Sequence, residues 1–299
     1  MVEDPRAIAD GRSPPVAFET DLMLPIARML KISLKLAVVA YIAGFALSAA
    51  ARPTIEELQA RDFLDDYESN IVYGYNIVME TERYAARYVG NKLRCTNCHL
   101  NGGTTPDAFP LNVAGLYPQW RSKNGVRNGI VLRIRECFLY SHNGVLPPDH
   151  APEVLAIAAY INYLSEGEVI GKRPQGAGVP TVPDTGFDPN PARGEVVYKR
   201  ACEVCHGADG AGTAAAPPLW GPESYNAGAG MNRIDKAAGF IWANMPLGQG
   251  RSLSHQEALD VAAFVKLQLR PFDPREGRLA KLAERIWLRI SGFFGAEQP

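Results

Sequence analysis

The chain has 299 residues, more than most single domains contain, which predicts two domains with additional terminal segments. Its 31 Lys and Arg residues are balanced by 32 Asp and Glu residues, for a formal net charge of −1. Because no basic excess is present to neutralise a phosphate backbone, the composition argues against nucleic acid as a partner.

The N-terminal segment, residues 1–51, has the layout of an export signal. Lys31 and Lys35 precede an uncharged run over residues 36–51, which ends in small residues before Arg52. The run is shorter than the roughly 20 residues of a spanning helix, which favours a cleaved signal peptide and leaves a retained membrane anchor open. Both alternatives predict a periplasmic protein, either soluble or anchored at its N-terminus.

The first domain is expected over residues 52–170 and contains the sequence Cys-Thr-Asn-Cys-His at Cys95, Cys98 and His99. This C-x-x-C-H pattern is the attachment signature of haem c. Two thiols three positions apart can form thioethers with both vinyl groups, and the adjacent imidazole can then ligate the iron. A zinc half-site or a redox-active cysteine pair would be alternatives for one isolated copy.

Cys137 is the one cysteine outside the two C-x-x-C pairs, and it follows His99 by 38 residues. The one methionine in the sequence of this domain, Met79, precedes the motif, so no methionine follows His99 here. We therefore predict that Cys137 is the sixth iron ligand, and that its thiolate lowers the reduction potential of this haem. A buried free cysteine and ligation by His142 remain open as alternatives.

A second C-x-x-C-H pattern follows at Cys202, Cys205 and His206, in a domain expected over residues 192–272. The preceding residues 171–191 are rich in Gly and Pro and lack apolar periodicity, so they are predicted to form a linker. Two copies behind an export signal favour two covalently bound haem c groups over one shared zinc site, which would require Cys and His at tetrahedral spacing.

The two halves repeat one pattern of expected helices. Residues 81–99 and 191–206 form the approaches to the two motifs, and both are expected to be helical. Residues 152–167 and 255–269 close the domains and have apolar side chains at i, i+3, i+4 and i+7. No segment alternates apolar and polar residues as a half-buried β-strand would. The sequence therefore predicts an all-α protein with two cytochrome c-like domains.

Met245 lies 39 residues after His206 and is followed by Pro246. A thioether ligand raises the potential of an electron-transfer haem, so Met245 is predicted to ligate the second iron. Met231, 25 residues after His206, is the competing methionine in this domain.

The C-terminal tail, residues 273–299, is expected to form an amphipathic helix. Leu279, Leu282, Ile286 and Ile290 share one face of it. Packing on its own domain is favoured, with a membrane surface or a partner helix as the alternative.

With these residues in place, the chain resembles the tetrathionate-forming thiosulfate dehydrogenase family, periplasmic dihaem cytochromes with His/Cys ligation at the active-site haem and His/Met ligation at the other. The resemblance spans roughly residues 70–270 and is carried by the phrases LRCTNCHLNGGT, YPQWRSKNG, RIRECFLYSHNG and FIWANMPLG. It implies an enzyme that joins two thiosulfates into tetrathionate. The electrons would leave through the second haem to a soluble or membrane-bound acceptor, such as another cytochrome or a high-potential iron–sulfur protein.

The same resemblance places Arg133, Ser141 and Arg121 at the substrate, with Cys137 as the catalytic sulfur. Thiosulfate and tetrathionate are dianions, whose oxygens guanidinium groups can bind in a bidentate manner. As an alternative, either arginine could pair with a surface carboxylate or with a haem propionate. The chain departs from the family pattern at Leu139, Tyr140, His142 and Asn244.

Two other functions remain open. An electron carrier would relay charge through both haems without a substrate, but it has no evident need for a thiolate ligand such as Cys137. The cytochrome subunit of the multienzyme sulfur-oxidising system also uses His/Cys haems, but it works with a small partner subunit and a carrier protein.

Overall fold

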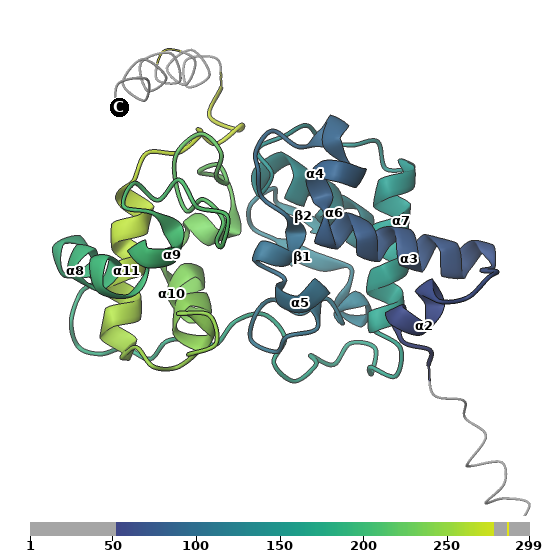
Figure 1. Ribbon diagram of the computed structural model, residues 1–299, viewed down its shortest axis with the longest axis horizontal. Coiled ribbons are helices and arrows are strands. Elements are labelled where there is room, and N and C mark those ends of the chain that lie inside the picture. Colours follow the sequence, from purple (N-terminus) through teal and green to yellow (C-terminus); the bar gives the residue numbers. More distant parts are fainter. Residues whose placement is uncertain (1–51, 278–285, 287–299) are drawn as a thin grey trace, which may run out of the picture. The chain divides into compact units, whose positions relative to one another are not determined.

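The computed structural model describes residues 52–277 and residue 286 (Figure 1). The predicted signal or anchor and most of the predicted tail helix lie outside these residues. One compact unit begins at Ile55 and contains both haem-attachment motifs. Among the described residues, the regular secondary structure is helical apart from one short hairpin, which confirms the all-α class. Within the described ranges, no helix is both long enough and apolar enough to cross a bilayer.

The core of the first half lies between α3 (Asp66–Met79) and α7 (Pro152–Leu164), which pack against each other. Gly74 allows this close approach, because a Cβ atom there would lie only 2.1 Å from the carbonyl oxygen of Ala156. Shorter elements complete this half: α2 (Ile55–Gln59), α4 (Thr81–Tyr84), α5 (Leu100–Gly103) and α6 (Ile130–Tyr140). The predicted closing helix of the first domain is thus α7.

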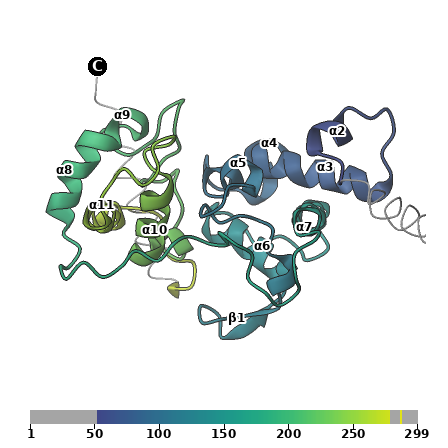
Figure 2. The same cartoon turned by 90° about the horizontal axis from the view of Figure 1, so that it is seen from below.

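The second half repeats this packing with α8 (Pro191–Ala201) and α11 (His255–Leu267), which Figures 1 and 2 show side by side. A Cβ atom at Gly194 would lie 2.0 Å from the carbonyl oxygen of Asp260. Each half therefore uses one glycine to bring its first long helix against its last. The remaining elements are α9 (Glu203–His206), the 3-10 turn η4 (Gly230–Asn232) and α10 (Ile234–Asn244).

The two approaches to the motifs differ from each other. In the second half α8 runs almost directly into α9, as expected. In the first half the expected helix is interrupted: α4 is followed by the 3-10 turns η1 (Ala86–Tyr88) and η2 (Cys95–Asn97). The Asn91 amide donates to the carbonyl oxygens of Ser141 and Ser224, at 2.9 and 3.0 Å. These long-range bonds hold the intervening backbone in a non-helical path.

A small antiparallel hairpin, β1 (Gln119–Arg121) and β2 (Val126–Asn128), corrects the expectation that the chain contains no strand. Three-residue strands are too short to show an alternating pattern. The hairpin leads directly into α6, to which it is fastened by a buried polar cluster. Asn124 and Asn128 each donate to the Glu136 carboxylate at 2.7 Å, and Asn128 is fully buried.

Asn128→Ala is expected to lower the free energy of unfolding by about 1–3 kcal/mol, because it removes a donor from a buried carboxylate. Denaturant unfolding of the haem-loaded protein measures this change. Asn70→Ala is the matched control, since Asn70 is exposed and its amide bonds only to the carbonyl oxygen of Asp66. Equal losses in the two variants would contradict the prediction.

Residues 165–190, which include most of the predicted linker, contain no helix or strand. This segment is nevertheless fastened to the first half. Gly176 and Gly178 accept backbone hydrogen bonds from Asp107 and Phe109, each at 2.8 Å. The exact domain boundary remains a prediction.

Candidate active site

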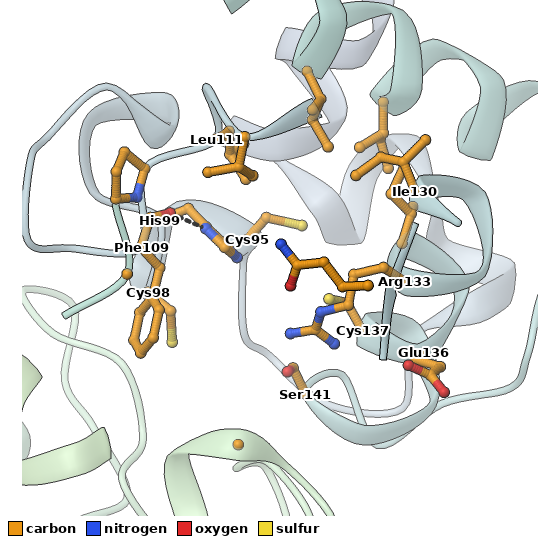
Figure 3. A pocket seen from close by; sticks show the side chains of 18 of the residues that line it. Cys95, Cys98, His99, Phe109, Leu111, Ile130, Arg133, Glu136, Cys137 and Ser141 are labelled. Atoms are coloured by element: carbon orange, nitrogen blue, oxygen red, sulfur yellow. Dashed lines mark hydrogen bonds between the residues drawn. The ribbon is translucent and has the colours of Figure 1, made fainter. Parts of the chain in front are cut away.

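A cavity of about 500 Å³ lies beside the first C-x-x-C-H motif (Figure 3). Its wall includes Cys95, Cys98, His99 and Cys137. The volume falls within the range of about 300–1,000 Å³ that is typical of cofactor pockets. The cavity therefore contains both thiols for covalent attachment and the two predicted iron ligands.

His99 is arranged as an iron ligand would be. Its Nδ1 lies 2.5 Å from the carbonyl oxygen of Phe109, to which it donates (Figure 3). Burial lowers the pKa of His99 to about 4, so the ring is neutral. Nδ1 therefore carries the proton, and Nε2 keeps the lone pair that a metal requires.

The thiols of Cys95 and Cys98 are buried, and this burial raises the pKa of each to about 12. Neutral thiols along a cavity fit the attachment of a haem through thioethers. No cluster of three or more His, Cys, Asp or Glu side chains suited to a metal ion occurs within residues 52–277. The cysteines and histidines of the two motifs do not converge as a shared zinc site would require.

Helix α6 and Ser141, the C-cap that follows it, supply three of the predicted substrate and ligand residues. Arg133, Cys137 and Ser141 are spaced four apart, so they occupy one helical face, and all three line the cavity. Figure 3 shows them together beside the motif. The charge of a Cys137 thiolate raises the pKa of Arg133, which is half-buried. The predicted site residues of this half thus come together.

Arg121 reaches the same cavity from β1. Its Nη2 donates to the Tyr117 hydroxyl at 3.0 Å, while its buried Nε has no hydrogen-bond partner. Within the described part of the chain, neither Arg121 nor Arg133 forms an ion pair with a carboxylate. Pairing with a surface carboxylate is therefore not observed, and both guanidinium groups remain available to an anion.

The structure adds cationic residues that the sequence did not identify. Lys123 lines the cavity from the hairpin turn and lies 4.1 Å from the centroid of the Tyr140 ring. Burial lowers the pKa of Lys123. Arg233 and Lys236, from the second half, line the same cavity. For Lys123, the sequence offered one signal, its place within the YPQWRSKNG phrase. For Arg233 and Lys236 it offered none.

His142, the alternative ligand, is buried at the edge of the cavity. Its Nε2 lies 3.4 Å from the Cys95 Sγ, and its Nδ1 has no partner. His142 and Cys137 both line this cavity, and Cys95 would be one of the two thiols that hold a haem there. Ligation by Cys137, with His142 as the alternative, stays a prediction.

The second half presents a similar donor set. The Nδ1 of His206 lies 2.8 Å from the carbonyl oxygen of Pro217, and burial lowers the pKa of this imidazole. Met245 is half-buried and directly follows α10, and its backbone N–H donates to the carbonyl oxygen of Ile241. The competing Met231 packs against apolar clusters that include Tyr225 and Ala237. Ligation by Met245 stays a prediction.

Several known proteins are similar to this chain. The cytochrome c family model matches residues 191–268. The chain is 42% identical over 217 residues to the thiosulfate dehydrogenase of Thiomonas intermedia, covering 71% of this chain and 69% of the relative. It is 43% identical over 225 residues to that of Stutzerimonas stutzeri, covering 72% and 73%.

A solved structure is also similar. The thiosulfate dehydrogenase TsdBA of Marichromatium purpuratum, in its as-isolated form, superposes with a TM-score of 0.70 at 36% identity. The match covers 80% of this chain and 54% of the solved chain, so the present protein spans about half the length of that structure. Sequence identity over two thirds of several relatives, together with the shared fold, shows that the chain belongs to the thiosulfate dehydrogenase family.

Proposed function

We propose that this protein is a periplasmic dihaem cytochrome c that oxidises two thiosulfates to tetrathionate. The observation that carries the proposal is the single cavity in which Cys137 lies with a haem-attachment motif and two guanidinium groups without carboxylate partners. A sulfur nucleophile, an electron acceptor and binding groups for a dianion are the three components that this reaction requires.

Cys95, Cys98 and His99 would hold the first haem, with Cys137 as its sixth ligand. When bound, the two haems would supply one-electron acceptors for the two electrons released at Cys137. The chain's own residues bind and orient the sulfur compounds. Arg121 and Arg133 hold one thiosulfate by its sulfonate oxygens, with Ser141 as a further hydrogen-bonding group.

The proposed reaction has two steps. The Cys137 thiolate and the terminal sulfur of one thiosulfate form a sulfur–sulfur bond as two electrons are lost. The terminal sulfur of a second thiosulfate then attacks the sulfane sulfur of this adduct. The bond to Cys137 breaks, tetrathionate leaves, and the thiolate is restored. Charge and atoms balance without a proton transfer.

Two haems per chain are expected, because His206 repeats the geometry of His99 and Cys202 and Cys205 repeat the thiol pair. A pyridine haemochrome assay should return two haems per chain, and the double variant Cys202→Ser, Cys205→Ser should retain one. A wild-type value of one haem or none would reject this part of the proposal.

The activity itself is tested with the isolated chain, thiosulfate and ferricyanide. We expect tetrathionate in a ratio of one for every two ferricyanide ions reduced. An electron carrier would reduce no ferricyanide with thiosulfate as the donor. The cytochrome subunit of a multienzyme system would require its partner subunit and carrier protein. Absence of tetrathionate from the complete isolated reaction would therefore overturn the proposed function.

A further inference from the structure

Tyr117 lies near Arg121 and Arg133, and the proposed function assigns it no role. Its side chain lines the cavity, and its hydroxyl accepts a hydrogen bond from Arg121 Nη2 at 3.0 Å. The Arg121 guanidinium carbon also lies 5.8 Å from the centroid of the Tyr117 ring. The pKa of Arg133 on α6 is raised chiefly by Cys137 and further by Tyr117, which lines the same cavity. The Tyr117 hydroxyl is therefore hydrogen-bonded to Arg121 and lies near Arg133.

The chemistry of a phenol defines what this arrangement can bind. A tyrosine hydroxyl has two acceptor sites and one proton, whereas a guanidinium group only donates. The bond from Arg121 occupies one acceptor site and leaves the hydroxyl proton for another acceptor. None of the hydrogen bonds formed among residues 52–277 uses this proton. The buried Arg121 Nε likewise lacks an acceptor. An oxyanion would satisfy both donors.

The position of the hydroxyl is fixed by the local fold. Tyr117 follows the 3-10 turn η3 (Ala114–Leu116), to which its backbone N–H donates at 3.0 Å. It precedes the hairpin that Asn128 and Glu136 fasten to α6. The hairpin carries Arg121 and the helix carries Arg133, so Tyr117 lies near guanidinium groups from two different elements.

We propose that Tyr117 binds and positions the substrate: its hydroxyl sets the spacing of Arg121 and Arg133 and donates its proton to a sulfonate oxygen of the bound anion. This inference rests on the proposed function, because it identifies how that site orients a sulfur dianion. It requires Tyr117 to act together with Arg121, not as an independent packing residue.

The test uses Tyr117→Phe in the haem-loaded protein, which keeps the ring and removes only the hydroxyl. Tetrathionate binding to the fully ferric protein is measured by calorimetry, with and without Cys137→Ala, because the ferric state supplies no electrons for net turnover and Cys137→Ala forms no cysteine adduct. We expect the Kd to rise about 10- to 100-fold, as for loss of a hydrogen bond to a charged group. The kcat/KM for thiosulfate should fall by a similar factor, with unchanged haem content.

Tyr73→Phe is the matched control, because its hydroxyl lies outside the cavity, 3.5 Å from the carbonyl oxygen of Tyr84. It should bind tetrathionate as the wild type does. In an Arg121→Met background, Tyr117→Phe should have a smaller effect than in the wild type, since contacting residues couple. Additive effects, or wild-type binding by Tyr117→Phe, would overturn the inference.

The experiment separates the two proposals. If the wild type binds tetrathionate but does not oxidise thiosulfate, the proposed reaction fails, while the binding data still decide the role of Tyr117. If the wild type oxidises thiosulfate and Tyr117→Phe binds tetrathionate normally, only the inference about Tyr117 fails. A wild type that binds no tetrathionate would overturn both.

Discussion

Cys137→Ala is expected to lose nearly all thiosulfate oxidation, by roughly 10³- to 10⁶-fold, while both haems and the fold are retained. Cys137 is the sulfur on which the proposed adduct forms, and none of the other residues of the cavity described here can replace it at that position. Steady-state assays with ferricyanide measure the loss. The ferric spectrum of the first haem should also lose its low-spin thiolate signature.

Arg135→Ala is the control for this variant. Arg135 lies two residues before Cys137 on α6, but its Nε donates to the carbonyl oxygen of Pro147 and it does not line the cavity. Its activity should stay close to that of the wild type. Near-wild-type oxidation in Cys137→Ala would refute the adduct mechanism, and an unchanged ferric spectrum in that variant would refute ligation by Cys137.

Met245→Gly is expected to lower the reduction potential of the second haem by on the order of 100 mV or more. Haem potentials vary over a range of roughly 0.8 V with the identity of the iron's ligands. The thioether stabilises the reduced iron, so its removal makes this haem harder to reduce and slows the exit of electrons. Spectroelectrochemical titration measures the potential, and the spectrum of the first haem should stay unchanged.

Met231→Gly distinguishes the two candidate ligands of the second haem. Met231 packs against apolar residues, so its replacement is expected to affect stability more than potential. A large fall in the second potential in Met231→Gly, with none in Met245→Gly, would assign the ligand to Met231 instead.

Contacts at the end of α10 join the predicted Met245 ligand to the first half. Asn244, its neighbour, donates to the carbonyl oxygen of Asp107 at 3.0 Å, and Arg251 pairs with the Asp107 carboxylate at 2.8 Å. The carbonyl oxygen of Phe109 accepts a hydrogen bond from His99. The Phe109 ring stacks on the Phe240 ring of α10, with 6.0 Å between the ring centroids. One short segment, residues 107–109, therefore contacts both predicted haem environments.

Features that depend on spacing along the chain could be predicted before the fold was known. Haem attachment requires Cys, Cys and His within five residues, so Cys95 and Cys202 could each be identified with their motifs. The closing helices α7 and α11 followed from apolar periodicity, because a helix buries residues at fixed intervals. The offsets that singled out Cys137 and Met245 followed from comparing one half with the other, and their ligation remains a prediction.

Features that depend on contacts between distant segments became visible only in the folded chain. The Asn91 bonds that interrupt the first approach, the close contact at Gly74, and the meeting of Tyr117 with Arg121 and Arg133 all join different elements. Local sequence patterns describe which face of one element is apolar. They do not show which polar side chain of another element contacts that face. Such hydrogen bonds and packing contacts form only when distant segments come together in the folded chain.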